Sequence, residues 1–168
     1  LQIELNCDDR YVNLVEQGVD VAVRLGKLAD STLGAAYLGL NPWVLAASPG
    51  YLKAHGRPRK PQDLGRHEAL IYSTVQGDER WLLSGTDGRQ ISVSVRGRLR
   101  SNNLSMLLAA ARQGFGIAAL PRYVAHRSLT EGALTSVLDD WALPSQEVHA
   151  VFPSPRMVPA KVRLLITW

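Results

Sequence analysis

Three consecutive small polar residues, Ser101, Asn102 and Asn103, stand directly before an apolar stretch with helical periodicity. Their hydroxyl and amide groups can accept hydrogen bonds from the free N–H groups at the start of a helix. Those N–H groups and the positive end of the helix dipole also form a receptor for a carboxylate or another small anion. The triplet therefore favours anion binding in addition to helix capping. Plain capping, which needs no ligand, is the alternative.

A helix and a buried strand must position this triplet. The apolar face of the helix repeats at the spacing i, i+3, i+4 and i+7 and consists of Leu104, Leu107, Leu108 and Ala111. Gly114 is expected to end the helix in the left-handed conformation. Residues 116–120 are wholly apolar and lead to Pro121, which is typical of a strand buried on both sides of a parallel sheet.

The first part of the chain predicts a β-α-β unit. Residues 1–7 alternate apolar and polar side chains, as a strand does. Asp8 and Asp9 can cap a helix over residues 11–17, which Gly18 would end. Residues 19–26 read as a second strand, so the two strands are expected to pair in parallel through a right-handed crossover.

The remaining elements follow from turn signals. Ser48, Pro49 and Gly56 delimit a short helix, and Asp87-Gly88 lies at the tip of a hairpin. The other predicted elements are strands at 36–47 (interrupted at Asn41-Pro42), 70–73, 134–138 and 148–152, a turn at 61–64, a helix at 122–129, and a final helix starting near Pro159 with Val162, Leu165 and Ile166 facing inward.

Composition excludes several classes of protein. The chain has 168 residues, is 46% hydrophobic and carries a formal charge of +4, too small a surplus to indicate direct nucleic-acid binding. One cysteine, Cys7, allows no internal disulfide and is expected to be a small buried apolar group in a reducing, cytoplasmic setting. No apolar run is long enough to span a membrane, and the chain starts without a signal peptide, as if in mid-domain.

The sequence carries no pattern typical of an enzyme or a metal site. His55, His67, His126 and His149 show no ligand spacing, so no metal and no cofactor are expected. No nucleophile stands beside a base in a known arrangement. The G-x-G-x-x-A pattern that begins at Gly114 follows a helix and enters a strand, the reverse of a dinucleotide site.

A stripe of arginines stands before the polar triplet. Arg96, Arg98 and Arg100 alternate along an extended segment, so their guanidinium groups share one face. The favoured interpretation is a solvated strand edge that discourages aggregation. The alternative is a row of phosphate contacts.

The order of elements indicates an α/β fold of two lobes joined by crossing strands. We assign residues 1–46 and 148–168 to lobe I and residues 47–147 to lobe II. A cleft between such lobes is a usual site for a small molecule.

Three segments resemble one protein family. They are residues 19–26 (VDVAVRLG), residues 47–64 (ASPGYL, followed by His55-Gly56, Pro58, Pro61 and Asp63-Leu64) and residues 114–121 (GFGIAALP). In this order and spacing they resemble LysR-type transcriptional regulators, over the effector-binding domain and essentially the whole chain. The resemblance implies the type 2 periplasmic-binding-protein fold, N-terminally truncated. The first strand and helix of the domain, and the winged helix-turn-helix before it, would lie outside this sequence.

The resemblance also implies a function and partners. The chain would bind a small, often anionic metabolite and act without catalysis, as a homodimer or homotetramer. Contact with DNA would run only through the absent N-terminal domain, with no membrane partner. The helices at 11–17 and 104–111 are the candidate dimer contacts. A solute-binding protein of a transport system is the first alternative, and an enzyme on the same scaffold is the second.

The predicted ligand-binding residues come from both lobes. Carried over by position, they are Arg24, Gly26, Lys27 and Ser31 after the second strand, Tyr72 and Ser73 at the end of a lobe II strand, and Ser101, Asn102 and Asn103 at the capped helix. A carboxylate would be held at the helix start and assisted by a cation from the other lobe. For Arg24, an ion pair with Asp20 or Glu16 is the structural alternative.

Overall fold

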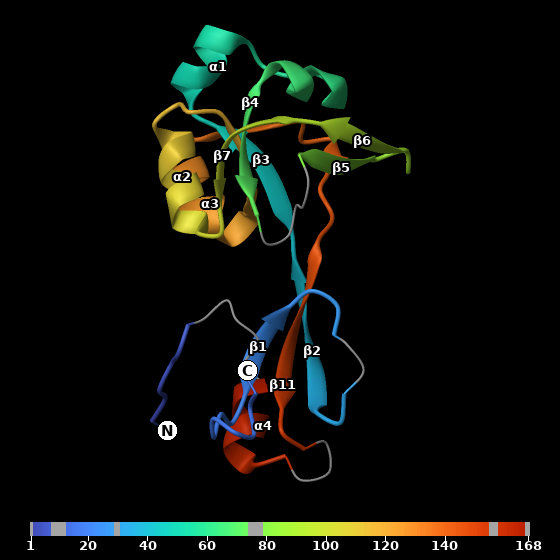
Figure 1. The fold of residues 1–168 in the computed structure, drawn as a ribbon, viewed down its shortest axis with the longest axis vertical. Helices are drawn as coiled ribbons and strands as arrows, with labels where there is room; N and C mark the ends of the chain where they lie inside the picture. The colour runs from blue at the N-terminus through green and yellow to red at the C-terminus, as the bar shows by residue number, and fades with distance from the viewer. Residues whose placement is uncertain (1, 8–12, 29–30, 74–78, 155–157, 167–168) are drawn as a thin grey trace. The chain divides into compact units, whose positions relative to one another are not determined.

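The structure, a computed structural model, describes residues 2–7, 13–28, 31–73, 79–154 and 158–166. By its internal contacts the chain divides into two units (Figure 1). Unit 1 comprises Leu1–Leu40 and Gln146–Trp168, and unit 2 comprises Asn41–Ser145. The predicted boundaries lay at 46/47 and 147/148. Residues 43–46 lie in unit 2, because strand β3 (Trp43–Ala47) pairs with two strands of that unit.

Unit 1 contains a three-stranded sheet and a short helix. The sheet has the order β1-β11-β2, formed by β1 (Ala22–Leu25), β11 (Gln146–Phe152) and β2 (Gly34–Asn41), and the helix is α4 (Ala160–Ile166). Strands β1 and β11 are antiparallel, with Arg24 opposite His149. In α4, Val162 is buried as predicted, whereas Leu165 is 45% exposed, so the prediction that it faces inward is wrong.

The predicted β-α-β unit at the start of the chain is wrong for the described residues. Residues 2–7 are exposed and belong to no helix or strand, so the strand predicted from their alternating pattern is absent there. Residues 14–18 form a turn that Gly18 ends at a φ of 63°. The rest of the predicted helix and its capping residues, 8–12, lie outside the described ranges. The free thiol of Cys7 is exposed, which contradicts the prediction that it is buried.

Unit 2 is organised around a five-stranded mixed sheet of order β7-β4-β8-β3-β9. Its strands, besides β3, are β4 (Glu68–Tyr72), β7 (Arg96–Ser101), β8 (Ile117–Pro121) and β9 (Thr135–Val137). A smaller sheet has the order β10-β5-β6, from β5 (Arg80–Gly85), β6 (Gln90–Ser94) and β10 (Trp141–Ala142). The predicted hairpin at Asp87-Gly88 is confirmed, since β5 and β6 pair antiparallel across it.

Helices α2 (Leu104–Arg112) and α3 (Arg122–Thr130) lie side by side against the five-stranded sheet (Figure 1). The first helix of the unit, α1 (Pro49–His55), is capped by Ser48 as predicted, and a 3-10 helix, η1 (Pro61–Arg66), follows it. Strand β8 is buried along its whole length, as predicted. It runs parallel to β4 but antiparallel to β3, so the predicted parallel pairing holds on one side only.

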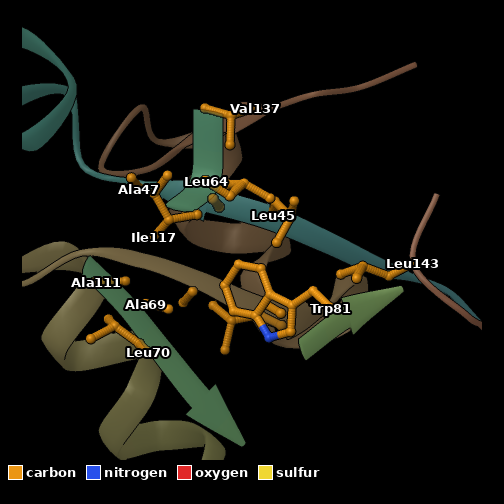
Figure 2. Packing of buried hydrophobic residues seen from close by; sticks show 14 of the residues in the cluster. Leu45, Ala47, Leu64, Ala69, Leu70, Trp81, Ala111, Ile117, Val137 and Leu143 are labelled. Atoms are coloured by element: carbon orange, nitrogen blue, oxygen red, sulfur yellow. The ribbon is translucent and has the colours of Figure 1, made fainter. Parts of the chain in front are cut away.

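The core of unit 2 fills the space between its two sheets and its helices. Trp81 stands at its centre and is 1% exposed, with Leu45 and Leu143 beside it (Figure 2). Leu107 and Ala111 project from α2 into the same cluster and are fully buried. This packing fixes α2 against β4 and β8, and with it the polar residues at the start of the helix.

Candidate functional site

The polar triplet forms the turn between the end of β7 and the start of α2. The hydroxyl oxygen of Ser101 accepts the N–H of Asn103 at 3.0 Å, and Oδ1 of Asn103 accepts the N–H of Met106 at 3.1 Å. Predicted capping is therefore confirmed, with Asn103 as the N-cap residue. Asn102 and Asn103 are exposed and Ser101 is half-buried, so the turn is open to a ligand.

The ends of two parallel strands meet at this turn. Tyr72, the last residue of β4, lies opposite Ser101 in the parallel register, and the N–H of Ser73 donates to the carbonyl of Ser101 at 3.1 Å. The structure thus brings the predicted unit 2 residues together at the carboxyl ends of β4 and β7, where ligands of α/β sheets commonly bind.

Tyr72 and Ser73 have different environments. Tyr72 is 8% exposed and its ring packs against that of Trp43, with centroids 5.9 Å apart. Ser73 is exposed. Tyr72 therefore contributes to the packing beside the turn, whereas Ser73 is exposed like Asn102 and Asn103.

The start of α2 is electrostatically suited to an anion. The N–H groups of Leu104 and Ser105 have no partner within the helix, because they belong to its first turn. No acidic residue stands in that turn. The positive end of the helix dipole is therefore uncompensated by a carboxylate of its own first turn, which favours a negatively charged group there.

The predicted residues of unit 1 form a second group. Arg24 is half-buried in β1, and Gly26, at a φ of 96°, donates its N–H to the carbonyl of Glu147 at 2.8 Å. Lys27 and Ser31 are exposed. Asp20, a candidate partner for Arg24, accepts Nζ of Lys161 at 2.7 Å.

Sequence reasoning missed His149, which pairs with Arg24, and the two side chains around it. His149 lies opposite Arg24 in the β1–β11 ladder, with Nε2 3.6 Å from the carboxylate of Glu147 and its ring edge-on to Tyr37 at 5.6 Å. Its Nδ1 is buried, and no hydrogen-bond partner for it is recorded in the described part of the chain. The sequence contained little signal for this group, because the register between β1 and β11 joins residues far apart in the chain.

The arginine stripe lies on β7, at the edge of the five-stranded sheet, and its side chains have partners within the unit. Arg96 lies 3.9 Å from the carboxylate of Glu68, and Arg100 lies 3.8 Å from that of Glu79. The guanidinium of Arg98 stacks on the ring of Phe115, 5.2 Å from its centroid. The edge-strand interpretation is thereby favoured over the row of phosphate contacts.

Across the described residues, no three His, Cys, Asp or Glu side chains gather closely enough to hold a metal ion. No helix in the described ranges is long and apolar enough to cross a membrane.

Comparison with known proteins gives one consistent result. The profile of the LysR substrate binding domain matches residues 1–168. The chain is 34% identical over 166 residues to the HTH-type transcriptional regulator PtxR of Pseudomonas aeruginosa, covering 99% of this chain and 53% of PtxR. It is 33% identical over 162 residues to an uncharacterized HTH-type transcriptional regulator of Haemophilus influenzae, covering 96% of this chain and 56% of that protein.

Solved structures agree with the sequence relatives. Full-length AphB, a Vibrio cholerae virulence activator of the LTTR family, superposes with a TM-score of 0.84 at 29% identity, covering 99% of this chain and 56% of AphB. The regulatory domain of CrgA, a LysR-type transcriptional regulator from Neisseria meningitidis, gives a TM-score of 0.79 at 26% identity, with 95% and 78% coverage. The chain spans about half the length of the curated relatives it matches.

Proposed function

Because this chain belongs to the family of LysR substrate-binding domains, and is thus the effector-binding regulatory domain of a transcriptional regulator, we propose that its effector is a small carboxylate held at the start of α2. The carboxylate oxygens would accept the N–H groups of Leu104 and Ser105. The side chains of Ser101, Asn102 and Asn103 would supply further hydrogen bonds, with Ser73 beside them.

The observation that carries this proposal is the convergence of β4, β7 and α2. Two parallel strands end there, a helix begins there, and polar side chains cover the exposed turn. A carboxylate at this position accepts charge-assisted hydrogen bonds from groups that packing against β4 and β8 already holds in place. Such a preorganised site loses little entropy on binding.

We assign a supporting role to unit 1. Arg24 is the cation that best fits a carboxylate, because its planar guanidinium can donate two parallel hydrogen bonds. Gly26, Lys27 and Ser31 are proposed as further effector contacts. His149, which lies opposite Arg24 in the β1–β11 ladder, would orient its guanidinium together with Glu147, whose carboxylate lies 3.6 Å from Nε2 of His149.

The proposed mode of action is binding without catalysis. The effector shifts the regulator between two states only to the extent that it binds one of them more tightly. The relatives are transcriptional regulators, which disfavours the two alternatives, a transport protein and an enzyme. We propose that the whole protein acts on cytoplasmic DNA through a separate helix-turn-helix domain, as a homodimer or homotetramer.

A thermal-shift screen with a panel of small mono- and dicarboxylates tests the site. We expect at least one of these compounds to raise the melting temperature of the wild-type chain, because a ligand that binds only the folded state stabilises it. Ser101→Ala and Asn103→Ala are each expected to reduce that shift strongly. If both variants keep the full shift, the effector does not bind at the start of α2.

Two control variants separate ligand contact from helix stability. Asn103→Asp keeps an N-cap oxygen, so it preserves the stability of the unliganded chain, but its negative charge should abolish carboxylate binding. Ser48→Ala removes the cap of α1 instead. It should lower the melting temperature of the unliganded chain while leaving the ligand-induced shift intact.

The role of Arg24 has its own test. Arg24→Gln is expected to lower the affinity for the same carboxylate by at least about tenfold, because a charge-assisted bidentate pair is lost. Lys161→Gln, which removes a unit 1 cation bonded to Asp20, serves as the matched control and should leave affinity unchanged. Equal affinity of Arg24→Gln and wild type would remove unit 1 from the proposed site.

A further inference from the structure

A buried hydrogen-bonded pair joins α1 to the segment that enters β4. The hydroxyl of Tyr51 lies 3.2 Å from Nδ1 of His67, and the two residues are only 3% and 7% exposed. The same hydroxyl accepts the backbone N–H of Glu68 at 3.0 Å. His55 stacks on the Tyr51 ring, with centroids 4.2 Å apart. We name Tyr51, His55, His67 and Glu68 the Tyr51 junction.

The hydrogen bonds of the junction favour one placement of its hydrogens. Because the oxygen of Tyr51 accepts the N–H of Glu68, its own hydrogen is available for Nδ1 of His67. His67 is then neutral, with its hydrogen on Nε2. A proton on Nδ1 would face the Tyr51 hydroxyl, for whose hydrogen the described residues record no second acceptor. Protonation would therefore leave a buried hydroxyl unsatisfied.

The surroundings of His67 also favour its neutral form. Burial lowers the pKa of His67 below its ordinary value of 6.5, and the neighbouring His55 lowers it further. Asp63 of η1 acts in the opposite direction, as the weakest of the three influences. Tyr51 remains a neutral donor, since burial raises its pKa, and the charges of Glu68 on β4 and Arg98 on β7 act on it with opposite signs.

Both elements that carry the proposed effector groups begin or end at this junction. Strand β4 starts at Glu68 and runs to Tyr72, and the backbone of Gly116 packs against the Glu68 carbonyl. Helix α2 starts after the polar triplet and ends at Arg112, two residues before Gly114. A Cβ placed on Gly114 would lie 3.4 Å from Oγ of Ser48 and 4.0 Å from Cβ of Tyr51. The far ends of β4 and α2 therefore rest on the junction.

We propose that the Tyr51 junction is a proton-sensitive contact whose opening in mild acid is transmitted along β4 and α2 to the backbone of Ser73, Ser101 and Asn103. Protonated His67 no longer accepts from Tyr51, so α1 loses its bond to the residue that links η1 to β4. This inference concerns unit 2 alone, and it stands whether or not Ser101–Asn103 hold the effector.

The sign of the pH effect follows from linkage. The unfolded chain takes up a proton at the ordinary pKa of histidine, before folded His67 does. The stability of unit 2 therefore falls as the pH drops below that value. The loss is complete once the pH passes the lower pKa of folded His67.

Nuclear magnetic resonance of the isotope-labelled chain tests the proposal. Between about pH 7.5 and about pH 5, the carbon-bound ring protons of His67 should titrate below the ordinary histidine range. The amides of Ser73, Ser101 and Asn103 should shift with the same midpoint. In His67→Gln, which is neutral throughout, those amide shifts should disappear. His126→Gln, a change at an exposed position of α3, should leave them unchanged.

Tyr51→Phe gives a second, independent readout. Removing the hydroxyl removes the bond that favours neutral His67, so the His67 midpoint should move to higher pH. Amide shifts that persist in His67→Gln would overturn the proposal. So would a His67 midpoint within the ordinary range in wild type, or one that Tyr51→Phe leaves unmoved. Effector binding plays no part in these measurements, so they succeed or fail separately from the proposed function.

Discussion

Gly116 shows how a single residue keeps two neighbouring strands close together. It lies where the chain enters β8, and its backbone packs directly against the carbonyl of Glu68. A side chain at this position would overlap that carbonyl, and the two backbones would have to separate. The contact therefore keeps β8 close to the start of β4.

We expect Gly116→Ala to destabilise unit 2 by about 2 kcal/mol or more, because a methyl group must be forced into a filled space. Urea unfolding followed by tryptophan fluorescence measures the loss. Gly50→Ala is the matched control, since a Cβ there meets nothing within 4 Å. It should stabilise the chain by about 0.5 kcal/mol through reduced freedom of the unfolded state. Equal stability of the two variants would contradict the contact.

Asp63 also makes the stability of unit 2 depend on pH. Its cause is a hydrogen-bonded carboxylate, whereas that of His67 is a buried neutral imidazole. The Asp63 carboxylate accepts the backbone N–H groups of Arg59 at 2.9 Å and Lys60 at 3.1 Å, and these bonds lower the pKa of Asp63 below 3.8. A lowered carboxyl pKa stabilises the fold above the unfolded value, and the stabilisation is lost as pH falls through the folded value. Asp63→Asn should therefore be less stable than wild type near neutrality, and unfolding curves of the two should converge in acid. If the difference in stability between the two proteins persists in acid, the charge of the Asp63 carboxylate does not cause it.

At the scale of elements, α2 depends on its buried face. Leu107 is fully buried against β4 and β8, whereas Met106, one position earlier, is 59% exposed. Leu107→Ala should cost roughly 2 to 5 kcal/mol of unfolding free energy. Met106→Ala should change it by less than about 0.5 kcal/mol. Thermal unfolding of both variants measures the difference, and similar losses would mean that α2 is packed on another face.

Elements defined by neighbouring residues could be predicted from the sequence. Ser48 and Asn103 cap their helices, and Gly114, at a φ of 78°, ends α2, because each effect acts within one turn of backbone. Asp87-Gly88 formed its hairpin for the same reason. The turn between β7 and α2 was predictable for the same reason, since Ser101, Asn102 and Asn103 are consecutive, whereas their role in effector binding stays a prediction.

Pairing between distant segments could not be predicted in the same way. Strand β1 pairs antiparallel with β11, and the whole of unit 2 separates these strands in the sequence. The local pattern favoured a parallel partner at residues 1–7 instead. His149, the residue opposite Arg24, was missed because it depends on that register, and its contacts Glu147 and Tyr37 were missed with it.

At the scale of the whole molecule, the proposed self-association can be tested on α2. The other candidate contact, at 11–17, lies partly outside the described residues, and its described part is a turn. Met106 is an exposed apolar side chain on α2. We expect the wild-type chain to sediment as a dimer and Met106→Glu to shift it toward monomer. Met106→Ala controls for folding. A wild-type chain that stays monomeric at high concentration would contradict dimerisation through this domain.

The division of the chain into two units also sets the order in which they can fold during synthesis. Unit 2 is one continuous segment, whereas unit 1 needs β11 from beyond that segment to complete the sheet that β1 begins. A nascent chain can therefore bury the unit 2 core on the ribosome while β1 still waits for its partner strand. Chains stalled when Ser145 has just left the exit tunnel, with β11 still inside it, should resist protease in the unit 2 core and be cut before Asn41. The turn formed by Ser101, Asn102 and Asn103 would therefore be folded before Arg24 is paired in a complete sheet.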